Sequence, residues 1–176
     1  MDTAQSQIMR RAAEDAVLEA KEDRTVRFLA SSTAQDRHGT VILPEGIRTD
    51  NYAKNPVVIW AHQTGGIFSG CDPDDVIGQA LSWEVTERGF EVTVRLLPGE
   101  LNPKAERIYR LVQAGVLRAM SIGFQPVRAH VEGDTTIYDE IDLLEVSIVI
   151  VPSNPDALAL RSLIGGPMKE RSQTRA

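Results

Sequence analysis

The sequence predicts a mainly β protein of the α+β class, in which a β-barrel is surrounded by a few helices. Three observations support this fold class. Short apolar segments alternate with turn residues at hairpin spacing, only two or three stretches have a helical composition, and a length of 176 residues fits one domain. A closed or nearly closed barrel leaves few free strand edges. We predict a helical arm over residues 1–24, a barrel domain over 25–164 and a flexible tail over 165–176.

The predicted strands begin after residue 24. Glu87-Arg88-Gly89 separates two alternating segments, which predicts a hairpin. Leu143–Val151 is predicted to be buried on both faces, because it is apolar apart from a glutamate and a serine. The predicted strands are Val26–Ala30, Gly39–Leu43, Pro56–His62, Val76–Thr86, Gly89–Leu97, Leu117–Ala129, Thr135–Tyr138 and Leu143–Val151.

Three segments are predicted to be helical. Ile8–Lys21 is rich in Ala, Glu and Arg and contains no Gly or Pro. Asn102 can cap a helix that has Pro103 in its first turn and ends at Gly115. Asp156–Leu163 would form a last short helix.

Composition argues against several classes of function. A net charge of -6 argues against non-specific nucleic-acid binding. A single cysteine allows no intrachain disulfide, and no apolar run approaches the roughly 18 residues of a membrane span. The polar N-terminus favours a cytoplasmic protein. No phosphate-binding loop and no metal-ligand spacing is present, so we expect neither a cofactor nor a metal.

His62 ends the apolar strand Pro56–His62. Strand parity would place its side chain on the same side as Val58 and Trp60. A histidine there can be a hydrogen-bonded strand end. It can also be a general base, because imidazole titrates near neutral pH.

Ser121 lies in the extended segment Arg118-Ala119-Met120-Ser121-Ile122-Gly123-Phe124. The alternation puts Ser121 and Gly123 on one face, and we expect the missing side chain of Gly123 to leave space over the serine hydroxyl. That space would suit a nucleophile approached by a peptide carbonyl. The alternative is a serine that packs on a polar strand face.

Glu145 interrupts the apolar strand Leu143–Val151. A buried carboxylate costs several kcal/mol unless it is paired, so we expect a partner, and His62 would serve as one. Ser147 shares the face of Glu145 and can join the same hydrogen-bond group. An arginine or backbone amides could equally bind the glutamate. Ser121, His62 and Glu145 together supply a nucleophile, a base and a carboxylate that orients the base.

Three motifs, in order along the chain, resemble those of tailed-phage prohead proteases of the HK97 type. The histidine motif is Asn55-Pro56-Val57-Val58-Ile59-Trp60-Ala61-His62, and the serine motif is Gly115 to Pro126. The third runs from Leu144 to Val149 and continues as Pro152-Ser153-Asn154-Pro155-Asp156-Ala157. Asp36-Arg37-His38-Gly39 and Val76-Ile77-Gly78 also fit.

The resemblance implies a serine endopeptidase of the herpesvirus-assemblin fold. Family members act inside the immature capsid, in the host cytoplasm, where they cut the scaffold or the scaffolding segment of the major capsid protein, and often themselves. It implies Ser121 as nucleophile and His62 as base, with Glu145 where the herpesvirus enzymes have a second histidine. Those enzymes support the oxyanion with paired arginines; here backbone N–H groups near Ser153 and Asn154 would do so. The fold analogy also suggests a homodimer.

The sequence also allows two rival interpretations. Cys71 could be the nucleophile with His62 as base, although three nearby aspartates would raise the pKa of its thiol. The chain could also be a non-catalytic capsid-assembly or scaffold-binding barrel that keeps the protease fold. His38 and His130 are expected to be solvated, and the carboxylates Asp36 and Asp142 are candidates should Glu145 point away from His62.

Overall fold

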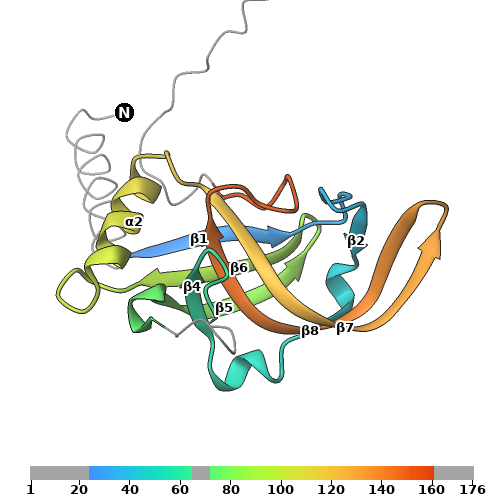
Figure 1. The fold of residues 1–176 in the computed structure, drawn as a ribbon, viewed down its shortest axis with the longest axis horizontal. Coiled ribbons are helices and arrows are strands. Elements are labelled where there is room, and N and C mark those ends of the chain that lie inside the picture. Colours follow the sequence, from blue (N-terminus) through green and yellow to red (C-terminus); the bar gives the residue numbers. More distant parts are fainter. Residues whose placement is uncertain (1–23, 65–71, 161–176) are drawn as a thin grey trace, which may run out of the picture.

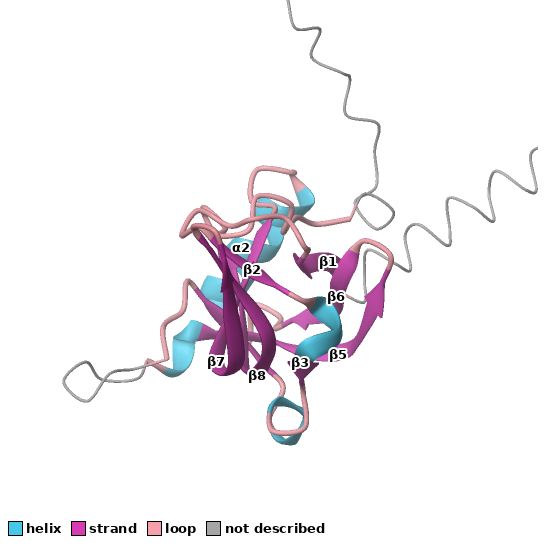
Figure 2. Cartoon of the chain, turned by 90° about the vertical axis from the view of Figure 1, so that its right-hand side faces the viewer, coloured by secondary structure: helices cyan, strands magenta, loops and turns pink. Residues whose placement is uncertain are grey.

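A computed structural model of the chain describes residues 24–64 and 72–160. The predicted mainly β class is confirmed, since eight strands join one sheet. The sheet curls into a half-barrel, and a long hairpin of its last two strands projects from the body (Figure 1). A view at right angles shows how few helices accompany the strands (Figure 2).

The hydrogen-bonded path through the sheet runs β1-β6-β5-β4-β8-β2, with β3 and β7 also pairing with β8. β8 is therefore the strand on which most of the sheet converges. The strands are β1 (Thr25–Ser31), β2 (Thr40–Ile42), β3 (Ile47–Arg48), β4 (Val57–Trp60), β5 (Val76–Thr86), β6 (Gly89–Leu96), β7 (Ala119–Glu132) and β8 (Thr135–Val149).

The helix predicted after Asn102 is confirmed as α2 (Pro103–Gln113). The Asn102 side chain accepts a hydrogen bond from the Ala105 N–H at 3.0 Å, which satisfies one free donor of the first turn. Gly115 follows the helix with a φ of 70°, a conformation that glycine adopts without strain. The other helices of the described residues are the short 3-10 helices η1 (Pro44–Gly46), η2 (Tyr52–Lys54) and η3 (Pro73–Asp75).

The prediction of two separate strands, Thr135–Tyr138 and Leu143–Val151, was wrong. They form the single strand β8, because β7 pairs with it from one end to the other. The prediction that Leu143–Val151 is buried throughout was also wrong, since Leu144 is 53% exposed and Ile150 74% exposed.

The helix predicted over Asp156–Leu163 was wrong for the part that the structure describes. Residues 157–160 run extended between β1 and β7 instead. The Leu29 N–H donates to the Leu158 carbonyl at 3.0 Å, and the Met120 N–H donates to the Ala157 carbonyl at 3.0 Å. This segment bridges the two strands and narrows the open side of the half-barrel, a tertiary role that overrides local helix propensity.

The hydrophobic core lies on the inner face of the curled sheet, and it includes the buried side chains of α2 that pack against this face. Its largest fully buried side chains include Phe28, Phe90, Ile77, Leu96, Met120 and Ile148. No helix in the described part of the chain is long and apolar enough to cross a membrane. The predicted helix Ile8–Lys21 and the tail from residue 165 lie outside the described residues.

Candidate active site

Three adjacent strands, β4, β8 and β7, carry or lead to the predicted site residues. β4 runs parallel to β8 and pairs Ile59 with Ser147. β7 runs antiparallel to β8 and pairs Ser121 with Ser147. The central strand β8 thus places Glu145 and Ser147 between the end of β4 and the serine of β7.

His62 lies in a turn beyond β4, not at the end of the strand as predicted. β4 ends at Trp60, and both Ala61 and His62 have positive φ, at 50° and 59°. Strand parity therefore does not decide where the imidazole points. Two consecutive non-glycine residues in this region cost roughly 1–2 kcal/mol each, and such strain is often retained at functional sites.

Hydrogen bonds to β8 hold this strained turn in place. The Ala61 N–H donates to the Ile148 carbonyl at 3.0 Å, and the His62 N–H donates to Ser147 Oγ at 3.1 Å. The backbone of the turn is thus attached to the same strand that carries Glu145.

Glu145 is buried and binds His62. Its Oε1 lies 2.6 Å from His62 Nδ1, and its Oε2 accepts a hydrogen bond from Ser147 Oγ at 2.6 Å. The Glu145 side chain is only 6% exposed, whereas the His62 side chain is 43% exposed. The expectation that this carboxylate must have a partner is confirmed, and Ser147 belongs to the same group.

Gly123 has a different role from the one we expected. It pairs with Glu145 across the β7–β8 ladder, and a Cβ on Gly123 would meet Glu145 Oε1 at 2.2 Å. The space over the glycine is therefore occupied by the carboxylate and not left open for a substrate. A side chain at this position would displace Glu145 from His62.

Ser121 lies on the same face of the β7–β8 ladder as Gly123, Glu145 and Ser147, and it is 7% exposed. Side chains directly opposite in such a pair have Cβ atoms about 5 Å apart. Among the described residues, no hydrogen bond joins Ser121 to His62. Because Glu145 engages Nδ1, Nε2 is the nitrogen left to accept a proton from the hydroxyl.

Glu145 raises the pKa of His62 above the usual value for histidine. The hydrogen bond to the carboxylate is the main cause and its negative charge adds to it, while partial burial acts in the opposite direction. The imidazolium is therefore favoured in the folded protein, as is required of a base that becomes positively charged during a reaction.

A pH profile tests this pairing. A general base must be neutral, so cleavage should increase as the pH rises through the pKa of His62 in the free enzyme. Glu145→Gln removes the negative charge and is expected to move the acidic limb of log kcat/KM to lower pH. Asp139→Asn is a matched control, because it removes the carboxylate that raises the pKa of a different histidine, His130 on the projecting hairpin. This variant should leave the acidic limb where it is in wild type. A limb that stays in place in Glu145→Gln would show that His62 is not the titrating base.

The loop that follows β8 brings Ser153 and Asn154 to a pocket that Ser121 also lines. Among the described residues, no acceptor is paired with the backbone N–H of either residue. The Asn154 side chain fastens the loop, since its Nδ2 donates to the Ser32 carbonyl at 3.1 Å. Within residues 24–64 and 72–160, these two N–H groups are therefore unpaired.

The Asp36-Arg37-His38-Gly39 turn supports the same loop, a role that the sequence alone did not show. The Arg37 N–H donates to the Ser153 carbonyl at 3.1 Å, and its guanidinium donates to the Pro152 carbonyl. Asp36 holds the turn closed, accepting hydrogen bonds from the backbone N–H groups of His38 and Thr40 at 2.9 and 2.8 Å.

The other candidate residues lie elsewhere or are already engaged. Asp36 holds its own turn, and Asp142 accepts a hydrogen bond from Asn51 at 2.9 Å. His130 binds Asp139 at 2.9 Å, but it lies nine residues beyond Ser121 along β7, about 30 Å at about 3.3 Å per residue. Cys71 lies outside the described residues.

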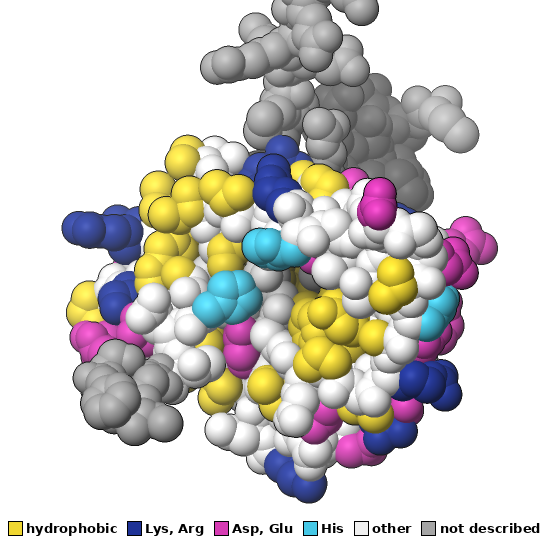
Figure 3. Space-filling model, turned by 45° about the vertical axis from the view of Figure 1, so that its right-hand side comes forward, with side chains coloured by type: hydrophobic (Ala, Val, Ile, Leu, Met, Phe, Trp, Pro, Cys, Tyr) yellow, Lys and Arg dark blue, Asp and Glu magenta, His cyan; other side chains and the backbone are white. Residues whose placement is uncertain are grey.

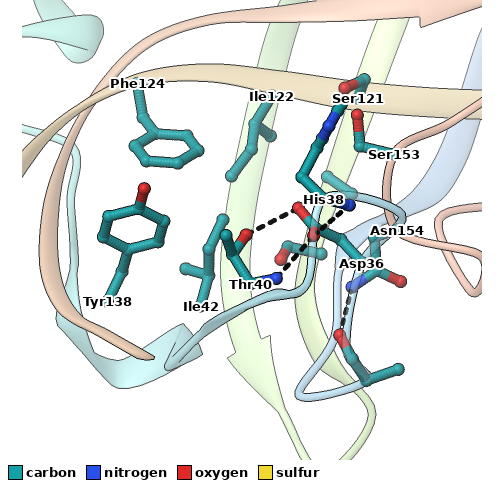
Figure 4. A pocket seen from close by; sticks show the side chains of 13 residues that line it. Asp36, His38, Thr40, Ile42, Ser121, Ile122, Phe124, Tyr138, Ser153 and Asn154 are labelled. Carbon is teal, nitrogen blue, oxygen red and sulfur yellow. Dashed lines mark hydrogen bonds between the residues drawn. The ribbon is translucent and has the colours of Figure 1, made fainter. Parts of the chain in front are cut away.

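His38 is exposed, as expected, but it also lines the pocket of Ser121. Its ring points toward Ser121 and Ser153 (Figure 4). In the described part of the chain, no carboxylate is hydrogen-bonded to this ring, so His38 lacks the orienting group that His62 has. Histidine side chains reach the surface between two areas of hydrophobic side chains (Figure 3).

A serine, a carboxylate-bound histidine and backbone N–H groups with no acceptor among the described residues lie in this part of the half-barrel, and serine hydrolases use groups of these kinds. Among the described residues, no group of three or more His, Cys, Asp and Glu side chains could hold a metal ion. Residues 25–164 match the family model described as caudovirus prohead serine protease. The match covers most of the chain, so the chain belongs to this family, as its motifs predicted.

Two curated relatives are similar to the chain. The prohead protease of Escherichia phage T5 is 32% identical over 139 residues, 75% of this chain and 60% of that protein. The capsid polyprotein of Pseudomonas phage PAJU2 is 27% identical over 143 residues, 77% of this chain and 20% of the polyprotein. The chain therefore spans less than two thirds of either relative's length.

A solved structure of the bacteriophage T4 capsid assembly protease is also similar. It is 12% identical, with a TM-score of 0.49, and the similarity covers 73% of this chain and 82% of that one.

Proposed function

We propose that the chain is a serine endopeptidase of prohead maturation, which cleaves the scaffold or the scaffolding segment of the major capsid protein. The hydrogen bond of 2.6 Å between His62 Nδ1 and the buried Glu145 carboxylate carries this proposal. The pair lies beside the strand that bears Ser121, in a chain of the prohead serine protease family. The relatives' names, a prohead protease and a capsid polyprotein, support a substrate within the capsid.

In the proposed reaction, Ser121 Oγ attacks the scissile carbonyl carbon while His62 Nε2 takes the hydroxyl proton. The C–N bond then breaks, and the same proton passes from His62 to the leaving amine. Water next attacks the ester carbon while His62 Nε2 takes a proton from it. The bond between the ester carbon and Ser121 Oγ then breaks, His62 returns the proton to Ser121 Oγ, and the acid product leaves. Glu145 keeps the imidazole in the tautomer that presents Nε2 and stabilises the imidazolium.

The negative oxygen of each tetrahedral intermediate would be bound by the backbone N–H groups of Ser153 and Asn154. Such donors contribute most when they are fixed before the reaction. Arg37 and Asn154 fix this loop through the hydrogen bonds described above. These hydrogen bonds support the proposal that the loop is held in place before the reaction.

Co-expression with the cognate shell and scaffold proteins tests the proposal. Ser121→Ala is expected to abolish cleavage of the scaffold or scaffolding segment, because only Ser121 supplies the attacking oxygen. Ser82→Ala is a matched control, since Ser82 is exposed and does not line the pocket of Ser121. Gel electrophoresis and sequencing of the new termini would measure both.

Unchanged cleavage in Ser121→Ala would exclude Ser121 as nucleophile. A non-catalytic, scaffold-binding barrel is the alternative function, and it predicts a different result. The wild-type chain would then bind the scaffold without producing new termini, and Ser121→Ala would bind it equally well.

The place of action follows from the proposed substrates. A protease that cuts scaffold within the assembled shell acts inside the immature capsid, in the host cytoplasm. The same co-expression tests this, since the wild-type chain should sediment with proheads, and a chain found only in the soluble fraction would contradict it.

A further inference from the structure

We infer that the pocket beside Ser121 is a specificity subsite for a large aliphatic or aromatic side chain of the substrate. This inference rests on the proposed function, and it names the class of peptide that the protease would cleave. The pocket has a volume of about 230 Å³. That is smaller than the roughly 300–1,000 Å³ of pockets that enclose whole drug-sized ligands, so it suits one side chain.

The pocket has a polar end and an apolar wall. Ser121, Ser153 and His38 lie together at one end, while an apolar group of side chains forms the wall away from them (Figure 4). Phe124 and Tyr138 contact each other edge to face, with ring centroids 5.2 Å apart. The wall consists of Ile42, Ile122, Phe124 and Tyr138.

Several polar side chains that line the pocket already have partners within the protein. Thr40 Oγ1 donates to Asp36 Oδ2 at 2.7 Å, and Asn154 Oδ1 accepts from Ser32 Oγ at 3.2 Å. Asp36, Thr40 and Asn154 therefore need no polar group from a ligand. An apolar side chain would enter without leaving these groups unpaired.

The sequence of β7 connects this wall to the reaction. Ser121, Ile122 and Phe124 lie close together on this strand, and all three line the pocket. Phe124 lies three residues beyond Ser121, about 10 Å at about 3.3 Å per residue. A peptide with its scissile carbonyl at Ser121 would reach the wall with a side chain within about three positions of the cleaved bond.

The test uses the full chain and a peptide mixture from a digested proteome, with cleavage sites read by mass spectrometry. We expect one position within about three residues of the cut to be enriched in Leu, Ile, Met, Phe or Tyr. Replacing that residue by Ala in a synthetic peptide should lower kcat/KM at least about tenfold, since even one methylene is worth about tenfold or more in a fitted pocket. Ile122→Phe should shift the preference toward smaller side chains.

Leu144→Ala is the matched control, because Leu144 is 53% exposed and lies outside the pocket, so its cleavage profile should equal that of wild type. Labelling by a fluorophosphonate separates two failures. Cleavage with labelled Ser121 but no apolar preference would overturn the subsite and leave the proposed function standing. Absence of both cleavage and labelling would overturn the function and the subsite with it.

Discussion

Replacing His62 by alanine is expected to lower the rate of peptide cleavage by at least about 10⁴-fold, as loss of the base does in comparable catalytic groups. The physical reason is that the buried carboxylate of Glu145 would have no imidazole to orient, and Ser121 would have no acceptor for its proton. The lost rate should appear in kcat, measured with any peptide that wild type cleaves, because the base acts on the transition state.

His38→Ala is the decisive comparison for this prediction. His38 lines the same pocket as Ser121, but the described residues give its ring no carboxylate partner. We expect the cleavage rate of this variant to stay within about tenfold of the wild-type rate. Loss of a general base would instead lower the rate by about 10²–10⁴-fold. If His38→Ala lowered the cleavage rate by about 10⁴-fold while His62→Ala stayed active, His38 and not His62 would be the base.

Gly123→Ala is expected to reduce activity by about 10²–10⁴-fold, approaching the effect of losing the orienting acid. A Cβ at this position would lie 2.2 Å from Glu145 Oε1 and 2.9 Å from its Cδ. The carboxylate must move, and its 2.6 Å contact with His62 is lost. NMR titration of His62 should show its pKa fall, because the partner that raises it has moved away.

A second glycine of the same hairpin controls for the backbone effect of the substitution. Nothing lies within 4 Å of a Cβ built on Gly133, although its φ of 59° strains an alanine there. Gly133→Ala should therefore lose some stability and keep both activity and the pKa of His62. If Gly123→Ala kept full activity with an unchanged titration, the carboxylate would not be the group that orients His62.

Much of the fold could be predicted because local signals and tertiary structure agree. The cap at Asn102 and the turn at Glu87-Arg88-Gly89 predicted α2 and the β5–β6 hairpin correctly. The last helix was predicted wrongly because residues 157–160 are held by backbone bonds to β1 and β7. Those partners are more than 30 residues away along the chain, so no local pattern shows them.

The candidate site likewise has residues that the sequence could predict and features that it could not. Glu145 could be singled out because an apolar strand makes a buried carboxylate conspicuous, and the structure gives it the histidine and serine partners it needs. The strained turn at His62 and the occupied space over Gly123 could not be predicted. Both depend on cross-strand register, which a single sequence does not specify.

The central claim is that Ser121 is a nucleophile activated by His62, and the residue that a fluorophosphonate modifies tests it most directly. The full chain would be treated with the reagent, digested and analysed by mass spectrometry. The account predicts one modified residue, Ser121, with labelling lost in His62→Ala and retained in His38→Ala. A chain that cuts its capsid substrate while Ser121 stays unmodified, or labelling at another residue, would contradict it.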